Sequence, residues 1–203
     1  MCCVVIFALG GCGKSNKEKV HETSTAEPEK TVAVNAGDIK VYLDEAKYYL
    51  YTAQATYETY YISEGKEIDW ESDMKDGTSW QQGIKSIVID DICRRESMYA
   101  LAGEYNVSLT EEEKSDVKTD VKNYYTKTNK KLSSKIDISQ KRLTYVFEKQ
   151  KIAQKVESIL NTTDKNFADE TYETWKTGNT VTAEEQWKKI TFSEHIFTLE
   201  DIK

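Results

Sequence analysis

The amino-acid sequence predicts a mainly α-helical protein with a small N-terminal β-hairpin and a short strand near the C-terminus. Two observations indicate helices. The chain of 203 residues contains one proline, Pro28, and proline interrupts helices. From Leu43 onward, apolar residues recur at alternating steps of three and four, which places them on one face of a helix. The hairpin is predicted from the alternating segment 31–41, which has a turn sequence at 35–38.

The composition is that of a folded protein with a polar surface. Charged residues make up 31% and hydrophobic residues 38% of the chain, and the mean hydropathy is −0.67. The net charge is −7, and the lysines alternate with acidic residues instead of forming a basic face. These features argue against nucleic acid as a partner. The 13 tyrosines indicate a core that is more aromatic than aliphatic.

The first residues resemble the signal of a bacterial lipoprotein. An apolar run ends in Leu9, Gly10 and Gly11, and Cys12 follows. We therefore expect residues 1–11 to be a signal peptide and Cys12 to carry the lipid that anchors the protein to the outer face of the cell membrane.

A secretory signal normally begins with positively charged residues, whereas here Met1 is followed directly by Cys2. We expect the true start to lie upstream. Residues 12–31 are polar and lack apolar periodicity, so they are interpreted as a flexible tether.

A phosphate-binding loop is the competing interpretation of the same segment, because Ala8 and Gly13-Lys14-Ser15 fit a loose form of that motif. Ile87-Val88-Ile89-Asp90 could then supply a magnesium-binding aspartate. However, such a loop must open an amphipathic helix, and the residues after Ser15 are polar. The run at 87–90 also continues without a turn, as in the middle of a buried helix. No nucleotide is therefore expected as a ligand.

The helices are expected in the following order. The first begins at Leu43 and ends at Ser63-Glu64-Gly65. The second spans about 78–105, with Asn106 in the left-handed conformation after it. Thr110 and Glu113 form a capping box that starts the third helix.

Residues 127–137 lack apolar periodicity and are expected to be a charged loop. Ser139 caps the fourth helix, which ends near 161–164. Residues 165–189 are expected to form two short helices joined at Gly178-Asn179, and 190–197 alternate like a strand.

No catalytic, metal or cofactor site is predicted. The histidines are His21 and His195, and the metal-binding patterns Cys-x-x-Cys and His-Glu-x-x-His do not occur. Cys93 is the one cysteine after the tether, so no internal disulfide framework is expected. We expect it to be buried.

Aromatic residues in and near the first two predicted helices are the candidate binding residues. Tyrosine and tryptophan offer rigid apolar area with a polar tip, which suits the binding of varied partners. For each residue taken singly, a place in the core is the alternative. The candidates for binding unfolded or extended polypeptides are Tyr49, Tyr57, Tyr60, Tyr61, Trp70 and Trp80.

The order of these segments resembles the N-terminal chaperone region of SurA- and PrsA-type foldases, especially lipoprotein forms from clostridial bacteria. The resemblance covers about residues 32–160. It is carried by Val34-Asn35-Ala36-Gly37-Asp38-Ile39, by Leu43-Asp44-Glu45-Ala46, and most specifically by Ala102 to Glu113. It implies a helical chaperone domain at 32–163 that binds unfolded exported polypeptides.

In that family a parvulin peptidyl-prolyl isomerase domain often follows, and Ser193-Glu194-His195-Ile196-Phe197 is similar to its opening strand. The extension at 164–203 is therefore expected to be the start of a truncated parvulin domain. The other parvulin segments have no counterpart, so catalysis is not carried over. Two alternatives stay open: an isomerase that is complete only in a longer gene product, and a non-catalytic surface-interaction lipoprotein.

Overall fold

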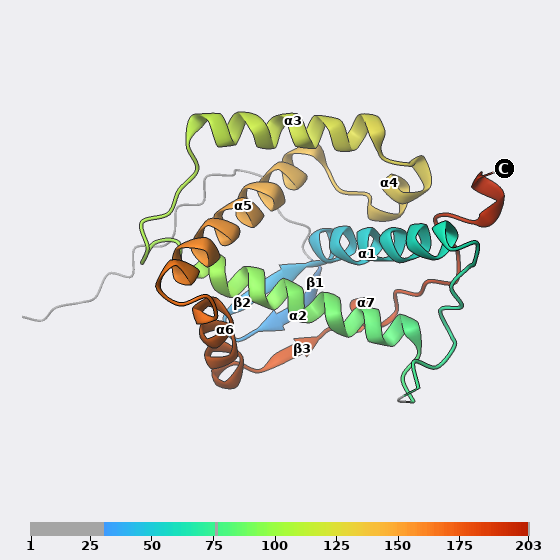
Figure 1. The fold of residues 1–203 in the computed structure, drawn as a ribbon, viewed down its shortest axis with the longest axis horizontal. Coiled ribbons are helices and arrows are strands. Elements are labelled where there is room, and N and C mark those ends of the chain that lie inside the picture. The colour runs from blue at the N-terminus through green and yellow to red at the C-terminus, as the bar shows by residue number, and fades with distance from the viewer. Residues whose placement is uncertain (1–30, 76, 203) are drawn as a thin grey trace, which may run out of the picture.

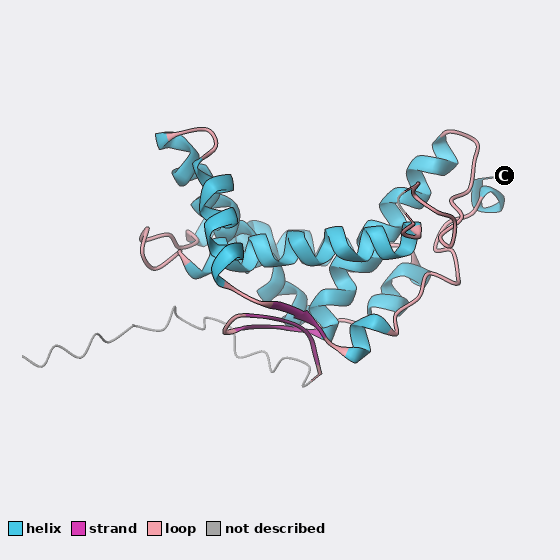
Figure 2. Ribbon diagram, turned by 90° about the horizontal axis from the view of Figure 1, so that it is seen from below, coloured by secondary structure: helices cyan, strands magenta, loops and turns pink. Residues whose placement is uncertain are grey.

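The protein is described by a computed structural model that covers residues 31–75 and 77–202. The predicted signal peptide 1–11 lies outside the described residues, as do Cys12 and the tether up to residue 30. The described part is mainly helical with a small antiparallel sheet, as the sequence predicts. Figure 1 shows the order of the helices, and Figure 2 shows the sheet along one side of the helical body.

The predicted hairpin is formed by β1, Val32–Ala36, and β2, Ile39–Tyr42, which pair in antiparallel fashion. Gly37 in the turn has a φ of +59°, a conformation that favours glycine. A Cβ atom at Gly37 would also lie 2.1 Å from Asn179 Oδ1. The turn therefore has room only for glycine, and it brings the hairpin against the segment after α6.

A third strand, β3, Val181–Ala183, pairs with the other edge of β1 and gives the sheet the order β2-β1-β3. The two short helices expected in this region are present, as α6, Phe167–Gly178, and α7, Glu185–Lys188. The prediction that they are joined at Gly178-Asn179 is wrong, because β3 lies between them. A strand of three residues leaves too short a pattern to recognise, and its partner β1 is remote in sequence.

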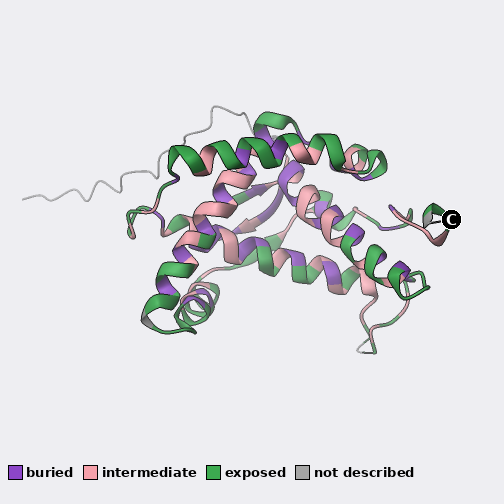
Figure 3. Cartoon of the chain, turned by 45° about the horizontal axis from the view of Figure 1, so that its top comes forward, coloured by how far each residue is buried: buried purple, intermediate pink, exposed green. Residues whose placement is uncertain are grey.

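Three long helices, α1, Leu43–Ser63, α2, Trp80–Ala100, and α5, Gln140–Thr163, pack against one another, and α1 also packs against the sheet. Their apolar faces supply most of the core, at about 25 cal/mol of stabilisation per Å² of apolar surface buried. Figure 3 shows that the buried residues gather where these helices meet, while α3 is largely exposed. The buried side chains on the three helices include Leu50, Ile84, Val88, Ile92, Leu143, Val146 and Val156.

The predicted bounds of α1 are confirmed at both ends. Helix α2 is shorter than predicted and ends at Ala100, although the run 87–90 lies inside it as expected. Asn106 does take the left-handed conformation, with a φ of +52°, and the Val107 N–H donates to the Ala102 carbonyl at 2.8 Å. This is the helix-ending arrangement that the sequence predicts, displaced from α2 by a turn at 101–106.

The capping box of Thr110 and Glu113 forms both of its hydrogen bonds and starts α3, Glu111–Lys127. The charged loop predicted for 127–137 is wrong, because Lys130–Ile136 forms a short helix, α4. Its buried Leu132 and Ile136 are four residues apart. A single apolar pair among lysines is too weak a pattern to predict a helix.

Helix α5 begins after Ser139, as predicted, and the side chain of Ser139 accepts a hydrogen bond from the Arg142 N–H. The strand expected at 190–197 is not formed. Residues 194, 196 and 197 are bends, and the backbone groups of the segment bond to side chains of α1 and α2 and not to a neighbouring strand. It leads to a short 3-10 helix, η1, Leu199–Ile202.

Candidate functional site

The candidate site is a cleft between α1 and α2, bordered by α5, and we call it the aromatic cleft. Its volume is about 320 Å³. The α1 wall has tyrosines at 48, 49 and 57, which together span about half of the helix circumference, because each residue turns an α-helix by about 100°. The lining residues are Tyr48, Tyr49, Thr52, Ala53, Thr56, Tyr57, Ile84, Ile87, Val88, Asp91, Arg95 and Gln150.

The α2 wall supplies aliphatic side chains from successive turns of the helix. Ile84 and Val88 are buried beneath the cleft, whereas Ile87 is 47% exposed. An isoleucine exposed to that extent beside tyrosine rings is an apolar surface open to solvent. The cleft can therefore gain free energy by covering apolar groups of a ligand.

A second hollow, of about 330 Å³, adjoins the aromatic cleft, because Tyr48 and Gln150 line both. Its other lining residues come from α3 and α5: Val117, Asp120, Phe147, Lys151 and Gln154. Tyr48 lies between the two hollows, with its ring centroid 5.6 Å from that of Phe147 and 6.0 Å from that of Tyr124. Together the two hollows offer a surface longer than either alone.

Charges of both signs lie at the rim. The Arg95 guanidinium lies 4.7 Å from the centre of the Tyr49 ring and 4.0 Å from Asp91 Oδ2. In the second hollow, Asp120 and Lys151 again have opposite charges. The rim thus has no dominant sign, which suits a polypeptide better than a phosphorylated ligand.

A buried ion network under the cleft ties α1, α2 and α5 together. Arg142 Nε lies 3.1 Å from Asp44 Oδ2, and Arg142 Nη2 lies 3.1 Å from Glu45 Oε2. Lys149 Nζ lies 2.6 Å from Glu45 Oε1 and also pairs with Glu96. All five side chains are almost fully buried, so their mutual pairing is what makes their burial tolerable.

The network extends to the cleft through Tyr49. Burial raises the pKa of the Tyr49 hydroxyl, and the charge of Glu45 adds to this effect while Lys149 opposes it. Burial also raises the pKa of Glu96, against the opposing charge of Lys149. The pKa of Lys149 is itself raised, because Glu45 and Glu96 outweigh its own burial. Lys149 is therefore held as a cation beneath the aromatic wall.

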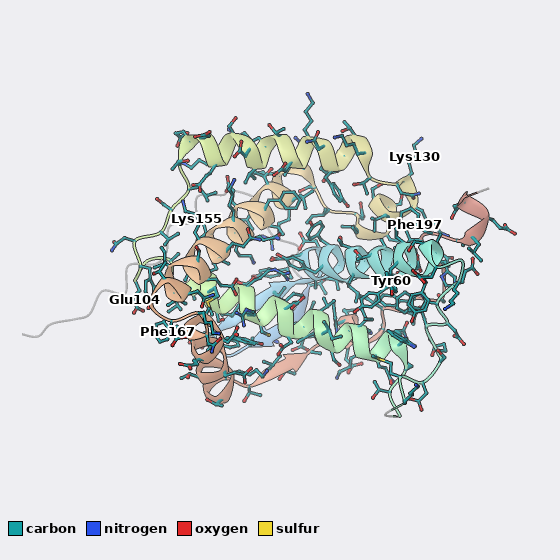
Figure 4. The ribbon with its side chains drawn as sticks, in the orientation of Figure 1. Tyr60, Glu104, Lys130, Lys155, Phe167 and Phe197 are labelled. Carbon is teal, nitrogen blue, oxygen red and sulfur yellow. The ribbon has the colours of Figure 1, made fainter. Side chains whose placement is uncertain are left out.

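The structure places the predicted binding residues in two groups. Tyr49 and Tyr57 line the aromatic cleft. The Trp80 ring centroid lies 6.3 Å from that of Tyr57 and 6.0 Å from that of Tyr61, so the aromatic row continues past the end of the cleft. Tyr60 lies next in the row and is 62% exposed. Figure 4 labels Tyr60 at the C-terminal end of α1.

Trp70 lies apart from this row. It is buried, and its Nε1–H donates to Glu58 Oε1 at 3.1 Å. Cys12, the predicted lipid attachment site, lies outside the described residues. Among the predicted residues, then, Trp70 serves the packing of another segment, and four α1 tyrosines with Trp80 share one surface.

The α2 side of the cleft was not predicted from the sequence. Ile84, Ile87 and Val88 recur at steps of three and four, a pattern that indicates a buried face but not which of its members stays exposed. Tyr48 was also not predicted as a binding residue, although its ring contacts those of Tyr49 and Phe147. The buried pairing of Arg142 and Lys149 with acids of α1 and α2 left no signal in the sequence.

Cys93 is a free, buried thiol, as expected, and burial raises its pKa to about 12, so the thiolate is disfavoured. Within 31–75 and 77–202, no cluster of three or more His, Cys, Asp or Glu side chains is placed to hold a metal ion. Over the same residues, no helix has both the length and the apolar character needed to cross a membrane.

Comparisons of the chain with family models, with curated proteins and with solved structures give no match.

Proposed function

We propose that this protein is a membrane-anchored extracytoplasmic chaperone that binds extended segments of unfolded exported polypeptides in the aromatic cleft. The observation that carries the proposal is an open cleft of about 320 Å³ between α1 and α2, lined by three tyrosines and by an Ile87 that is 47% exposed. The mechanism is holding: exposed apolar segments that are bound to the cleft cannot associate with one another.

The chemistry of the walls supports a polypeptide as the ligand. Tyrosine offers a large rigid surface with two side-chain torsions, so little conformational entropy is lost when it contacts varied apolar groups. The cleft volume is near the lower end of the ~300–1,000 Å³ typical of ligand sites, and the second hollow beside it adds further surface. Mixed rim charges also disfavour selection of one strongly charged ligand.

The membrane anchor is proposed from the sequence. Gly10 and Gly11 before Cys12, with an apolar run upstream, form a cleavage and acylation pattern. Acyl chains on Cys12 would hold the cleft near the membrane surface, where exported chains emerge unfolded. Membrane fractionation tests this part: the native chain should sediment with membranes and the Cys12→Ser chain should not.

The chaperone activity is tested on the full chain carrying Cys12→Ser, which cannot be acylated at that position. A chemically denatured client is diluted into buffer, and its aggregation is followed by light scattering. Scattering should fall as the protein is titrated to a molar excess over the client. Unchanged scattering at molar excess would rule out the chaperone function.

A further inference from the structure

The segment 188–199, which we call the C-terminal strap, lies in a groove whose walls are α2, α1 and the loop between them. It runs from the last residue of α7 past α2 to the first residue of η1, near the C-terminal end of α1 (Figure 1). Figure 4 labels Phe197 of the strap and Tyr60 of α1, both toward that end of the helix. The strap belongs to no strand, so its backbone groups need partners from elsewhere.

The α2 wall of the groove provides the first set of partners. Lys85 Nζ donates to the Lys188 carbonyl at 3.0 Å and to the Ile190 carbonyl at 2.9 Å. The Phe192 N–H donates to Gln81 Oε1. Gln81 and Lys85 lie about one turn apart on α2, so a single face of this helix contacts the first half of the strap.

The α1 wall contacts the second half in the same way. Gln54 Nε2 donates to the Glu194 carbonyl at 3.0 Å. Glu58 Oε2 accepts hydrogen bonds from the Ile196 N–H at 2.7 Å and from the Phe197 N–H at 2.9 Å. From the loop after α1, Glu67 Oε1 accepts a hydrogen bond from the Leu199 N–H at 2.8 Å.

These contacts are made to the main chain along the whole strap. The bonded backbone groups belong to residues 188, 190, 192, 194, 196, 197 and 199. Because main-chain groups are the same in every polypeptide, these bonds do not depend on the sequence of the bound segment. Selectivity must come from the side chains that the groove buries.

Two strap side chains are buried, and they are four residues apart. Phe192 and Ile196 are each 2% exposed, whereas Ser193 and Glu194 between them are exposed. The Phe192 ring lies against Trp70, with centroids 4.7 Å apart, and Trp70 is held in place by Glu58. The groove therefore offers two apolar sites at a fixed separation.

We propose that this groove is a second polypeptide-binding site, which the protein's own strap occupies as an intramolecular competitor. Its ligand class is a polypeptide segment outside any strand, with large apolar side chains four residues apart. This proposal rests on the proposed function only in taking a polypeptide as the ligand. The groove itself is a different site from the aromatic cleft.

The groove's walls are formed by elements outside the strap. Gln54 and Glu58 project from α1, and Gln81 and Lys85 from α2, two helices that pack together in the core. Gln54 Oε1 is buried and has no hydrogen-bond partner in the described part of the chain, so the strap does not use every polar group of the groove. A different segment can use that acceptor as well.

Competition within one molecule explains why the site is closed in the resting protein. A strap joined to its own groove has an effective concentration on the order of millimolar, so a free peptide with the same contacts is outcompeted. Weakening the strap should open the groove to a peptide added in trans.

The test uses a fluorescent peptide that copies residues 188–199, with binding followed by anisotropy. The full chain with Cys12→Ser is compared with the same chain carrying Phe192→Ala and Ile196→Ala. The strap-weakened chain should bind the peptide at least about tenfold more tightly. A peptide with aspartate in place of Phe192 and Ile196 should not bind. Equal binding by the two chains, both folded by circular dichroism, would overturn the proposal.

Native-state hydrogen exchange gives a second test on the chain with an unaltered strap. The amides of Ile196 and Phe197 should exchange through a local opening whose free energy is below that of Leu50 in α1. If they exchange only with global unfolding, the strap is a fixed part of the core and the proposal fails.

The two proposals fail separately. Loss of aggregation suppression with peptide binding intact would contradict the chaperone function alone. Absence of peptide binding with aggregation suppression intact would contradict the second site alone.

Discussion

Glu58 Oε2 accepts a hydrogen bond of 2.7 Å from the backbone N–H of Ile196, which lies 138 positions later in the chain. The other carboxylate oxygen, Oε1, accepts hydrogen bonds from Gln54 Nε2 and Trp70 Nε1 and lies 3.1 Å from His195 Nδ1. Glu58 is 1% exposed. One buried carboxylate thus joins α1, the loop after it and the C-terminal strap.

Replacing Glu58 with alanine should destabilise the protein by about 3 kcal/mol, because Trp70 Nε1 and two strap N–H groups lose their acceptor and stay buried. Urea unfolding of the two proteins measures the difference. Glu104→Ala is the matched control: Glu104 is exposed, and its replacement should change the free energy of unfolding by less than about 0.5 kcal/mol. Equal effects of the two changes would show that Glu58 does not hold the strap.

The buried ion network should respond very differently to two single substitutions. Lys149→Met leaves Glu45 and Glu96 buried without their shared cation and should cost about 3–5 kcal/mol. Glu96→Gln removes one of three negative charges that face only Arg142 and Lys149, so it should cost less than about 1 kcal/mol. Chemical denaturation of both variants checks this difference. Similar losses would mean that charge balance does not govern the network.

The same network predicts a pH dependence. Burial holds the pKa of Glu96 above its ordinary value of 4.5, against the pull of Lys149 and with Glu45 adding to the rise. The folded protein therefore binds this proton more tightly than the unfolded chain does. The stability that Glu96 contributes is complete below its unfolded pKa and is lost as the pH rises through its folded pKa.

Glu96→Gln removes this titration. The free energy of unfolding of the variant, minus that of the native sequence, should increase as the pH rises above 4.5 and become constant above the raised pKa. Urea unfolding from about pH 4 to about pH 8 measures it, and the subtraction cancels other titrating groups. A difference that does not vary with pH would contradict the assignment.

The aromatic cleft is tested by a charge placed on its exposed wall. Ile87→Asp should reduce the suppression of client aggregation several-fold, because a carboxylate must then be desolvated for an apolar segment to bind. Ile159→Asp is the matched control, since Ile159 is 39% exposed on α5 and lines neither hollow. Both changes cost similar helix propensity, about 0.7 kcal/mol. Equal loss of activity in the two variants would remove the cleft as the binding site.

Local sequence patterns predicted the helices well where the signals were local. Ser63-Glu64-Gly65 ends α1, the capping box of Thr110 and Glu113 starts α3, and Ser139 starts α5, all as expected. Prediction failed where the deciding contact was distant. The strand β3 exists because β1 offers a free edge to it, and 190–197 is not a strand because Glu58 and Gln81 take up its N–H groups.

The sequence by itself determined the helical character, most helix ends and the gathering of aromatic residues along α1, because these depend on residues a few positions apart. The tertiary structure alone decided which aromatic side chains share a surface. It placed Tyr49 and Tyr57 opposite Ile87 of α2, and it took Trp70 into the core as the partner of Glu58. The reason is physical: exposure, buried charge pairing and the strap's contacts depend on how helices pack, and packing joins residues that no sequence period relates.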